Sequence, residues 1–148
     1  MIIRTAGKAL IIRKDEILLI KHKKEQVYYT LPGGGQNHNE SIKTCLKREC
    51  LEEIGYDVKV EDLVFLYEYI GDLDDHPEKG YHQVDMVFKV NLKDKIHDPI
   101  EMDVTQIGSQ WIKLNDLMDC LVYPMAIREK ILNYVTFKNQ RTYFSNEK

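Results

Sequence analysis

Residues 31–56 read LPGGGQNHNESIKTCLKRECLEEIGY, the most informative part of the sequence. An apolar segment ends at a proline and three glycines, and a helical pattern begins after the polar residues that follow. Its apolar side chains recur at helical spacing: Ile42, Cys45, Leu46 and Cys50. Ser41 or Asn39 can cap the first turn, and Gly55 stands where the helix should end. The stretch therefore predicts a strand, a glycine loop and a helix over residues 40–54.

The end of this helix carries three glutamates, Glu49, Glu52 and Glu53. On a helical wheel of about 100° per residue they continue the apolar stripe, so they should face the protein or line a cleft in it. A solvated face is the commoner interpretation of a Glu-rich helix, but such a face usually alternates its charges, whereas Glu49 and Glu53 form a like-charge pair. The neighbouring Arg48 alone cannot neutralise three acids. A hard divalent cation such as Mg²⁺ or Mn²⁺ would do so.

The glycine run at residues 33–35 has two interpretations. A simple turn is the commoner explanation of such a run. Alternatively, glycines let the backbone approach a ligand closely, so that carbonyls can coordinate a metal and amides can meet phosphate. Beside an inward-facing acid cluster, the second interpretation makes the loop half of a site.

The composition limits the class of protein. The chain has 148 residues, of which 43% are hydrophobic and 30% charged, as expected for a single domain over residues 1–148. A net charge of −3 gives no support for nucleic-acid binding through a basic surface. Local cations or a bound metal can still hold a phosphorylated ligand. Residues 139–148 are polar, and we expect this end to fray.

The cysteine pattern and residues 1–24 indicate the cellular compartment of the protein. The three cysteines contain no C-x-x-C pair and leave an odd count, so a disulfide framework is not expected. Charged residues interrupt the apolar run of residues 1–24, which therefore fits neither a membrane span nor a signal peptide. We expect a soluble cytoplasmic protein that has no contact with membranes.

Outside the central stretch, short strands alternate with helices. Strands are predicted over residues 8–13, 16–23, 27–32, 56–71, 81–92 and 109–114, the first two as a hairpin. Two further helices are predicted over residues 115–121 and 124–137, the second starting at Pro124. Polar connections fill residues 72–80 and 93–108. This order predicts an α+β fold, an α/β/α sandwich with a mixed β-sheet.

The glycines and charged residues of the central stretch stand at the spacing of a known signature. Gly34 is followed after five residues by Glu40 and after seven more by the run RECLEEIGY, residues 48–56. This pattern resembles the 23-residue signature of the Nudix hydrolases, with every charged and glycine position filled. Cys50 and Tyr56 replace the usual aliphatic residues, a change that affects packing more than chemistry. The resemblance implies a Nudix-type sandwich with a strand–loop–helix–loop catalytic motif.

The resemblance also implies an activity and a metal site. The expected reaction is metal-dependent hydrolysis of a pyrophosphate bond in a nucleoside diphosphate that is linked to another group. Glu49, Glu52 and Glu53 would bind Mg²⁺ or Mn²⁺, and the carbonyl of Gly33 is a plausible further ligand by similarity.

Other signature residues would support these carboxylates. Arg48 would orient the neighbouring carboxylates in the catalytic site, and Glu40 would hold Arg48 through a salt bridge. Gly34 and Gly55 complete the motif as backbone positions.

More than one residue is a candidate for the base that takes the proton from water. In many relatives it is an acidic residue on the loop before the strand that carries the tryptophan. Here that loop offers Glu101 and Asp103, and we prefer Glu101 because its longer side chain reaches further. A solvated role for either acid, or a helix glutamate acting as the base, is an alternative.

The sequence defines the substrate less well. Tyr29, Tyr69 and His82 are candidates to stack on a base, although most aromatic residues on strands belong to the core. Four other histidines stand in polar surroundings and need no special role: His22, His38, His76 and His97.

The resemblance favours a small nucleotide as the partner, first an ADP-ribose-like nucleoside diphosphate sugar. A house-cleaning nucleoside triphosphate pyrophosphohydrolase is the alternative within the same chemistry. A non-catalytic nucleotide-sensing domain is a further alternative, but such domains usually lose the signature acids. Relatives often dimerise, so a homodimer is compatible with the sequence.

Overall fold

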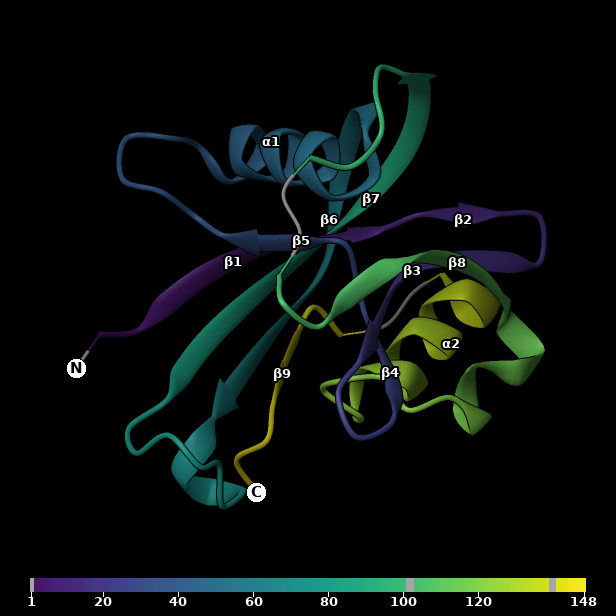
Figure 1. Ribbon diagram of the computed structural model, residues 1–148. Coiled ribbons are helices and arrows are strands. Elements are labelled where there is room, and N and C mark those ends of the chain that lie inside the picture. Colours follow the sequence, from purple (N-terminus) through teal and green to yellow (C-terminus); the bar gives the residue numbers. More distant parts are fainter. Residues whose placement is uncertain (1, 101–102, 139–140) are drawn as a thin grey trace.

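The chain folds around a five-stranded mixed sheet, shown in the computed structural model of Figure 1, which describes residues 2–100, 103–138 and 141–148. In the order β5-β1-β7-β6-β9 its strands are Gly33–Gly35, Arg4–Leu10, His82–Lys95, Tyr56–Ile70 and Tyr143–Ser145. β1 runs parallel to β7 and antiparallel to β5, and β6 pairs antiparallel with β7 and parallel with β9. The glycine strand β5 therefore forms one edge, beside β1.

A second sheet packs beside the first. It contains β2 (Ile12–Arg13), β3 (Glu16–Lys23), β4 (Val27–Thr30) and β8 (Gln106–Lys113). Strands β2, β4 and β8 each pair antiparallel with β3. β3 is central, and its residues 17–20 are all buried, as is usual for a strand covered on both faces.

Helices cover this arrangement from two sides (Figure 1). The helical segments are α1 (Ile42–Ile54), η1 (Gly71–Leu73), η2 (Leu114–Asp119) and α2 (Ile127–Phe137). Leu46 and Cys50 of α1 pack in one core with Leu18 of β3. Ile131 of α2 packs in a second core with Leu19 of β3. The predicted α+β sandwich is confirmed.

Several element boundaries differ from the predicted ones. β1 begins at Arg4, four residues earlier than predicted, because residues 4–7 pair with β7 although they lack the bulky apolar side chains typical of a strand. Only Ile12–Arg13 form the first arm of the predicted hairpin, since residues 8–10 belong to β1 and pair with β7.

Towards the end of the chain, β7 runs to Lys95 and β8 starts at Gln106, so the predicted polar connection is shorter. α2 begins at Ile127 rather than at Pro124, and a 3-10 helix replaces the predicted short helix before it. The prediction of a frayed end is wrong for Tyr143–Ser145, which pair with β6 as β9.

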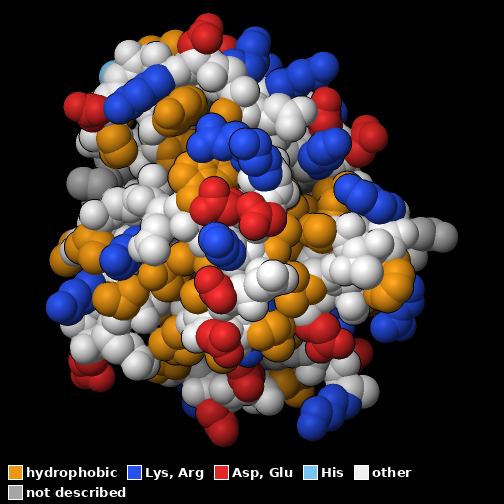
Figure 2. All heavy atoms as spheres, turned by 90° about the vertical axis from the view of Figure 1, so that its right-hand side faces the viewer, with side chains coloured by type: hydrophobic (Ala, Val, Ile, Leu, Met, Phe, Trp, Pro, Cys, Tyr) orange, Lys and Arg blue, Asp and Glu red, His pale blue; other side chains and the backbone are white. Residues whose placement is uncertain are grey.

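The surface agrees with a chain of small net charge. On the face shown in Figure 2, acidic and basic side chains are interspersed among apolar ones instead of forming one basic surface. No helix in the described part of the chain is long and apolar enough to cross a membrane.

Candidate active site

Helix α1 carries the acids, and its two ends are fixed as the sequence predicts. Ser41 is the N-cap, with φ −70° and ψ 160°, and its Oγ accepts a hydrogen bond from the Thr44 N–H at 3.1 Å. Gly55 ends the helix with φ 74°, and its N–H donates to the carbonyls of Cys50 and Leu51. A Cβ at Gly55 would lie 1.8 Å from the His97 carbonyl oxygen, so only glycine fits there.

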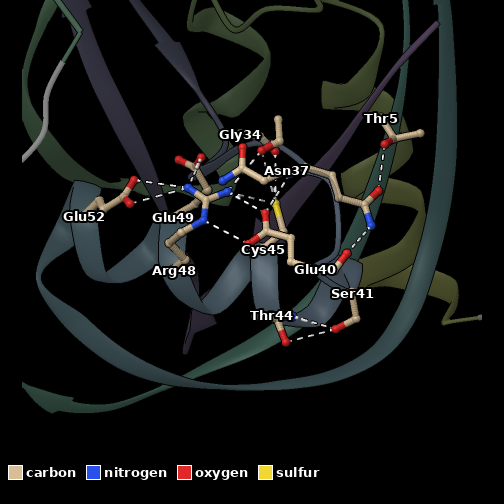
Figure 3. A network of polar contacts seen from close by, with 12 residues as sticks. Thr5, Gly34, Asn37, Glu40, Ser41, Thr44, Cys45, Arg48, Glu49 and Glu52 are labelled. Atoms are coloured by element: carbon tan, nitrogen blue, oxygen red, sulfur yellow. Dashed lines mark hydrogen bonds and ion pairs between the residues drawn. The ribbon is translucent and has the colours of Figure 1, made fainter.

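Arg48 joins Glu40, which precedes this helix, to Glu49 and Glu52 of the helix in one network (Figure 3). Its guanidinium lies 2.7 Å from Glu40, 3.0 Å from Glu49 and 3.4 Å from Glu52. Its Nη2 also donates to the carbonyl of Gly35 at 3.2 Å. The predicted salt bridge between Glu40 and Arg48 is therefore present, and the guanidinium joins α1 to the glycine strand.

The network moves the pKa values of its members in different directions. Hydrogen bonds from Arg48 and from the backbone of Asn37 lower the pKa of Glu40 to about 2. Burial raises the pKa of Glu49, although hydrogen bonding by Arg48 opposes this. The bonds to Glu40 raise the pKa of Arg48. Glu40 is thus the main partner of Arg48, and Glu49 is only partly neutralised.

Glu53 is held differently. Its Oε1 accepts the Gly33 N–H at 2.7 Å, and among the described residues no salt bridge reaches it. Burial raises its pKa to about 7, against the opposing effects of the Gly33 hydrogen bond and of Lys8. Of the three glutamates Glu49, Glu52 and Glu53, Glu53 is therefore the one without a salt bridge to Arg48.

The glycine strand approaches these carboxylates closely. A Cβ at Gly34 would lie 2.6 Å from the Glu49 carboxyl group, so a side chain there would displace Glu49. This close approach supports the functional interpretation of the glycine run over a simple turn.

These groups line a cavity of about 950 Å³, called here the acid cavity. Its charged lining residues are Arg4, Lys8, Arg48, Glu49, Glu52, Glu53 and Asp103. Its lining also contains His22, which is buried and hydrogen-bonded to Thr30 at 2.8 Å and Thr105 at 3.0 Å. Burial lowers the pKa of His22, so this part of the lining is polar with little positive charge.

A second cavity of about 720 Å³, called here the aromatic cavity, adjoins the first. Tyr81 stacks on His76 with ring centroids 4.3 Å apart, and Tyr69 meets both rings edge-on at about 6 Å. Four residues line both cavities: Lys8, Thr30, Tyr81 and Gln83. The two cavities are therefore adjacent.

The donor chemistry of the acid cavity fits a hard divalent cation, because its carboxylates are oxygen ligands. Within residues 2–100, 103–138 and 141–148, however, no three acid, histidine or cysteine side chains converge as a ready set of ligands. Glu49 and Glu52 are bonded to Arg48, and Glu53 to Gly33. Metal binding would thus require these side chains to exchange partners.

The candidate substrate and base residues lie in different places. Tyr69 lines the aromatic cavity, whereas Tyr29 and His82 line neither cavity. Tyr29 packs against the core, and His82 pairs with Glu68 at 2.6 Å. Both predictions are thus unsupported by position.

The two proposed bases are also placed differently. Asp103 lines the acid cavity. Glu101 lies outside the described residues.

Sequence reasoning missed several cavity residues. His22 and His76 were assigned no role, yet each lines a cavity, and His22 is buried. Arg4 of β1 and Gln83 of β7 also line the acid cavity and were not predicted. For Arg4 and Gln83 the sequence signal is strand alternation, since alternate residues of β1 and β7 point to the same side.

Comparisons with known proteins agree with this geometry. A family model described as NUDIX domain matches residues 3–132. A comparison with curated proteins found no match.

Solved structures share the fold. A NUDIX hydrolase from Nitrosomonas europaea is 18% identical, with 93% of this chain and 92% of that chain covered at a TM-score of 0.77. A MutT NUDIX hydrolase from Burkholderia pseudomallei is 26% identical, with 89% of this chain and 99% of that chain covered at a TM-score of 0.69. An ADP-ribose pyrophosphatase from Streptococcus suis is 19% identical, with 97% of this chain and 98% of that chain covered at a TM-score of 0.64. Because the family model spans most of the chain, this protein belongs to the NUDIX family and is an enzyme of its pyrophosphohydrolase class.

Proposed function

We propose that this enzyme hydrolyses the pyrophosphate bond of a nucleoside diphosphate linked to a sugar. The observation that carries the proposal is the junction of the acid cavity with the aromatic cavity through shared lining residues. Such a substrate has a charged centre and a flat apolar-faced end, and each cavity is within the usual size of ligand sites.

The face of the large sheet supports an orientation for the substrate. Lys8 of β1, Asp85 of β7 and Tyr67 of β6 lie on the cavity side, and Tyr67 is the direct neighbour of Asp85 across the β6–β7 pair. Strands stand about 4.8 Å apart and Lys8 pairs with Val87, two residues along β7 from Asp85, so the face changes from cationic to aromatic within about 12 Å. The pyrophosphate would lie over β1, near α1, and the nucleoside over β7 and β6.

The acids of α1 are the proposed metal ligands. Glu49, Glu52 and Glu53 would hold Mg²⁺ or Mn²⁺, with the carbonyl of Gly33 as a further ligand. When bound, the cation offsets the charge of the pyrophosphate and lowers the pKa of a coordinated water. Lys8 lies in the same cavity and adds positive charge on the substrate side.

The chain offers two acids that could take the proton from the attacking water. Glu101 remains our first proposal, and Asp103 is the alternative that lines the acid cavity. Comparing Glu101→Gln with Asp103→Asn would identify the base, because loss of the base should reduce kcat about 10²- to 10⁴-fold.

A nucleoside triphosphate is the second candidate substrate. Arg4 and Lys8 both line the acid cavity and could hold an additional phosphate. A nucleotide-sensing role fits less well, because all the signature acids are retained. Cytoplasmic location and a homodimer stay predictions, the latter testable by light scattering.

The test is a substrate panel. Wild-type protein and Glu53→Gln would be given nucleoside diphosphate sugars including ADP-ribose, dinucleoside polyphosphates and nucleoside triphosphates, with Mg²⁺ and with Mn²⁺. We expect turnover of the nucleoside diphosphate sugars, lost in the variant. Turnover of triphosphates alone would favour the second candidate, and nucleotide binding without any turnover would favour the sensor.

A further inference from the structure

A buried carboxylate in the aromatic cavity has no part in the chemistry proposed above. Asp85 of β7 is only 6% exposed and lines this cavity. Among the described residues it forms no salt bridge, and its side chain accepts one hydrogen bond, from Gln83 Nε2 to Oδ1 at 2.7 Å. Burying a carboxylate without full compensation is costly, so a ligand that donates hydrogen bonds would stabilise it.

A relay of side chains fixes this carboxylate in place. The Tyr81 hydroxyl donates to Gln83 Oε1 at 2.7 Å, and Gln83 Nε2 donates onward to Asp85. Both ends of the Gln83 amide are therefore engaged. The carboxylate of Asp85 is the strong acceptor that this relay holds toward the cavity.

The surroundings of Asp85 fit a flat ring better than a phosphate or a sugar. Val87 and Ile127 line the same cavity as apolar side chains, and the stacked rings of His76 and Tyr81 form its aromatic wall. Aromatic side chains of this kind stack on nucleobases.

The charges of this cavity also exclude phosphate. Its acidic lining residues are Asp74, Asp75 and Asp85, and within the described part of the chain its only cationic lining residue is Lys8, which the acid cavity shares. The Tyr69 hydroxyl already donates to Asp74 at 3.0 Å. Asp85 is thus the buried acceptor available to a base.

We propose that the aromatic cavity is a purine site in which Asp85 selects guanine. Guanine presents two neighbouring donors, N1–H and the 2-amino group, and a carboxylate can accept both. Adenine presents one amino group beside an unprotonated N1, whose lone pair would face the carboxylate. The inference rests on the proposed function, and it names the substrate class as guanosine diphosphate derivatives.

The direct test is binding of free nucleoside diphosphates to Glu53→Gln protein in Mg²⁺, measured by calorimetry. We expect GDP to bind on the order of tenfold more tightly than ADP, with IDP between them because it lacks the 2-amino group. Equal or tighter binding of ADP would overturn the proposal.

A specificity swap separates recognition from a structural role. In Asp85→Asn the amide offers one acceptor and one donor, which match the N1–H and C2 carbonyl of xanthine. This variant should lose affinity for GDP and gain affinity for XDP. Asp94→Asn makes the same charge change at an exposed residue of β7 outside both cavities and should leave the ratio of GDP to ADP affinity unchanged.

A carboxylate can also bind the two hydroxyls of a ribose, and the experiment distinguishes this case. If Asp85 held the ribose, 2′-deoxy-GDP would bind more weakly than GDP and Asp85→Asn would weaken GDP and ADP equally; that result would overturn the proposal.

The turnover assay separates failure of this inference from failure of the proposed function. ADP-glucose and GDP-glucose differ only in the base. Hydrolysis of both at equal kcat/KM would refute guanine selection and leave the pyrophosphohydrolase intact, whereas hydrolysis of neither would count against the nucleoside diphosphate sugar activity itself.

Discussion

The acid cavity and the aromatic cavity meet at Lys8 and Gln83, but they hold their side chains in different ways. In the acid cavity, buried carboxylates are balanced by one guanidinium and one backbone amide. In the aromatic cavity, rings stack on each other and only a few hydrogen bonds orient them. The acids of α1 serve catalysis, whereas the stacked rings and Asp85 serve binding. Changes in the first cavity should therefore lower kcat, and changes in the second should raise KM.

The largest effect is expected from Glu53→Gln. Removing this carboxylate removes a proposed metal ligand, so kcat should fall at least 10²- to 10³-fold. The matched control is Glu25→Gln, an exposed residue outside both cavities. A kcat near that of wild type would contradict the proposed role of Glu53.

The same substitution should have the opposite effect on stability. Burial raises the pKa of Glu53 from 4.5 to about 7, so between these pH values the folded protein keeps a proton that the unfolded chain loses. The free energy of unfolding contributed by this group therefore falls as the pH rises from about 4.5 to about 7. In thermal scans in EDTA, the Tm of Glu53→Gln should be higher than that of wild type at pH 8 and close to that of wild type at pH 4. A lower Tm at pH 8 would show that the buried charge is compensated.

The next effect concerns the residue that distributes the charge. Arg48→Lys keeps one positive charge but cannot reach Glu40, Glu49 and Glu52 together. Activity should fall about 10- to 100-fold, as when a group that orients metal ligands is removed. Metal titration of activity should show a weaker apparent affinity for Mg²⁺. Arg13→Lys is the control, because Arg13 stacks on Trp111 outside both cavities.

A smaller effect, confined to binding, is expected in the aromatic cavity. Tyr69→Ala removes a ring that packs edge-on against His76 and Tyr81, and loss of this support for the stacked pair should raise KM about tenfold. Tyr69→Phe keeps the ring and loses only the hydrogen bond to Asp74, so its KM should stay close to wild type. Steady-state kinetics of both variants test this. A fall in kcat with unchanged KM would contradict the assignment of substrate binding to the aromatic cavity and of catalysis to the acid cavity.

The two regions also differ in how far the sequence predicts them. The helix, its caps and the bond between Arg48 and Glu40 follow from one contiguous stretch, because the interacting residues are one or two turns apart. The aromatic cavity is assembled from distant segments, as when Asn146 reaches Ile70. Spacing along the chain carries no signal for such contacts. Long-range strand pairing decides them instead.

Particular residues show the same limit. Residues 4–7 lack the bulky apolar side chains typical of a strand, so the sequence does not predict the start of β1, yet Arg4 and Lys8 of this strand line the acid cavity. His76 lies in the loop between η1 and β7, and nothing in the sequence predicts that it stacks on Tyr81. Glu101 remains a prediction from the sequence.

The smallest effect tests whether the end of the chain shapes the aromatic cavity. The Asn146 side chain accepts the Ile70 N–H at 2.8 Å and donates to the Ile70 carbonyl at 2.9 Å, which fixes β9 beside the end of β6 and Tyr69. Asn146→Ala should lose two hydrogen bonds of about 1 kcal/mol each and raise KM severalfold without a change in kcat. Asn133→Ala on α2, outside both cavities, is the control. An unchanged KM would mean that the aromatic wall keeps its shape without β9, and that stacking alone positions the rings.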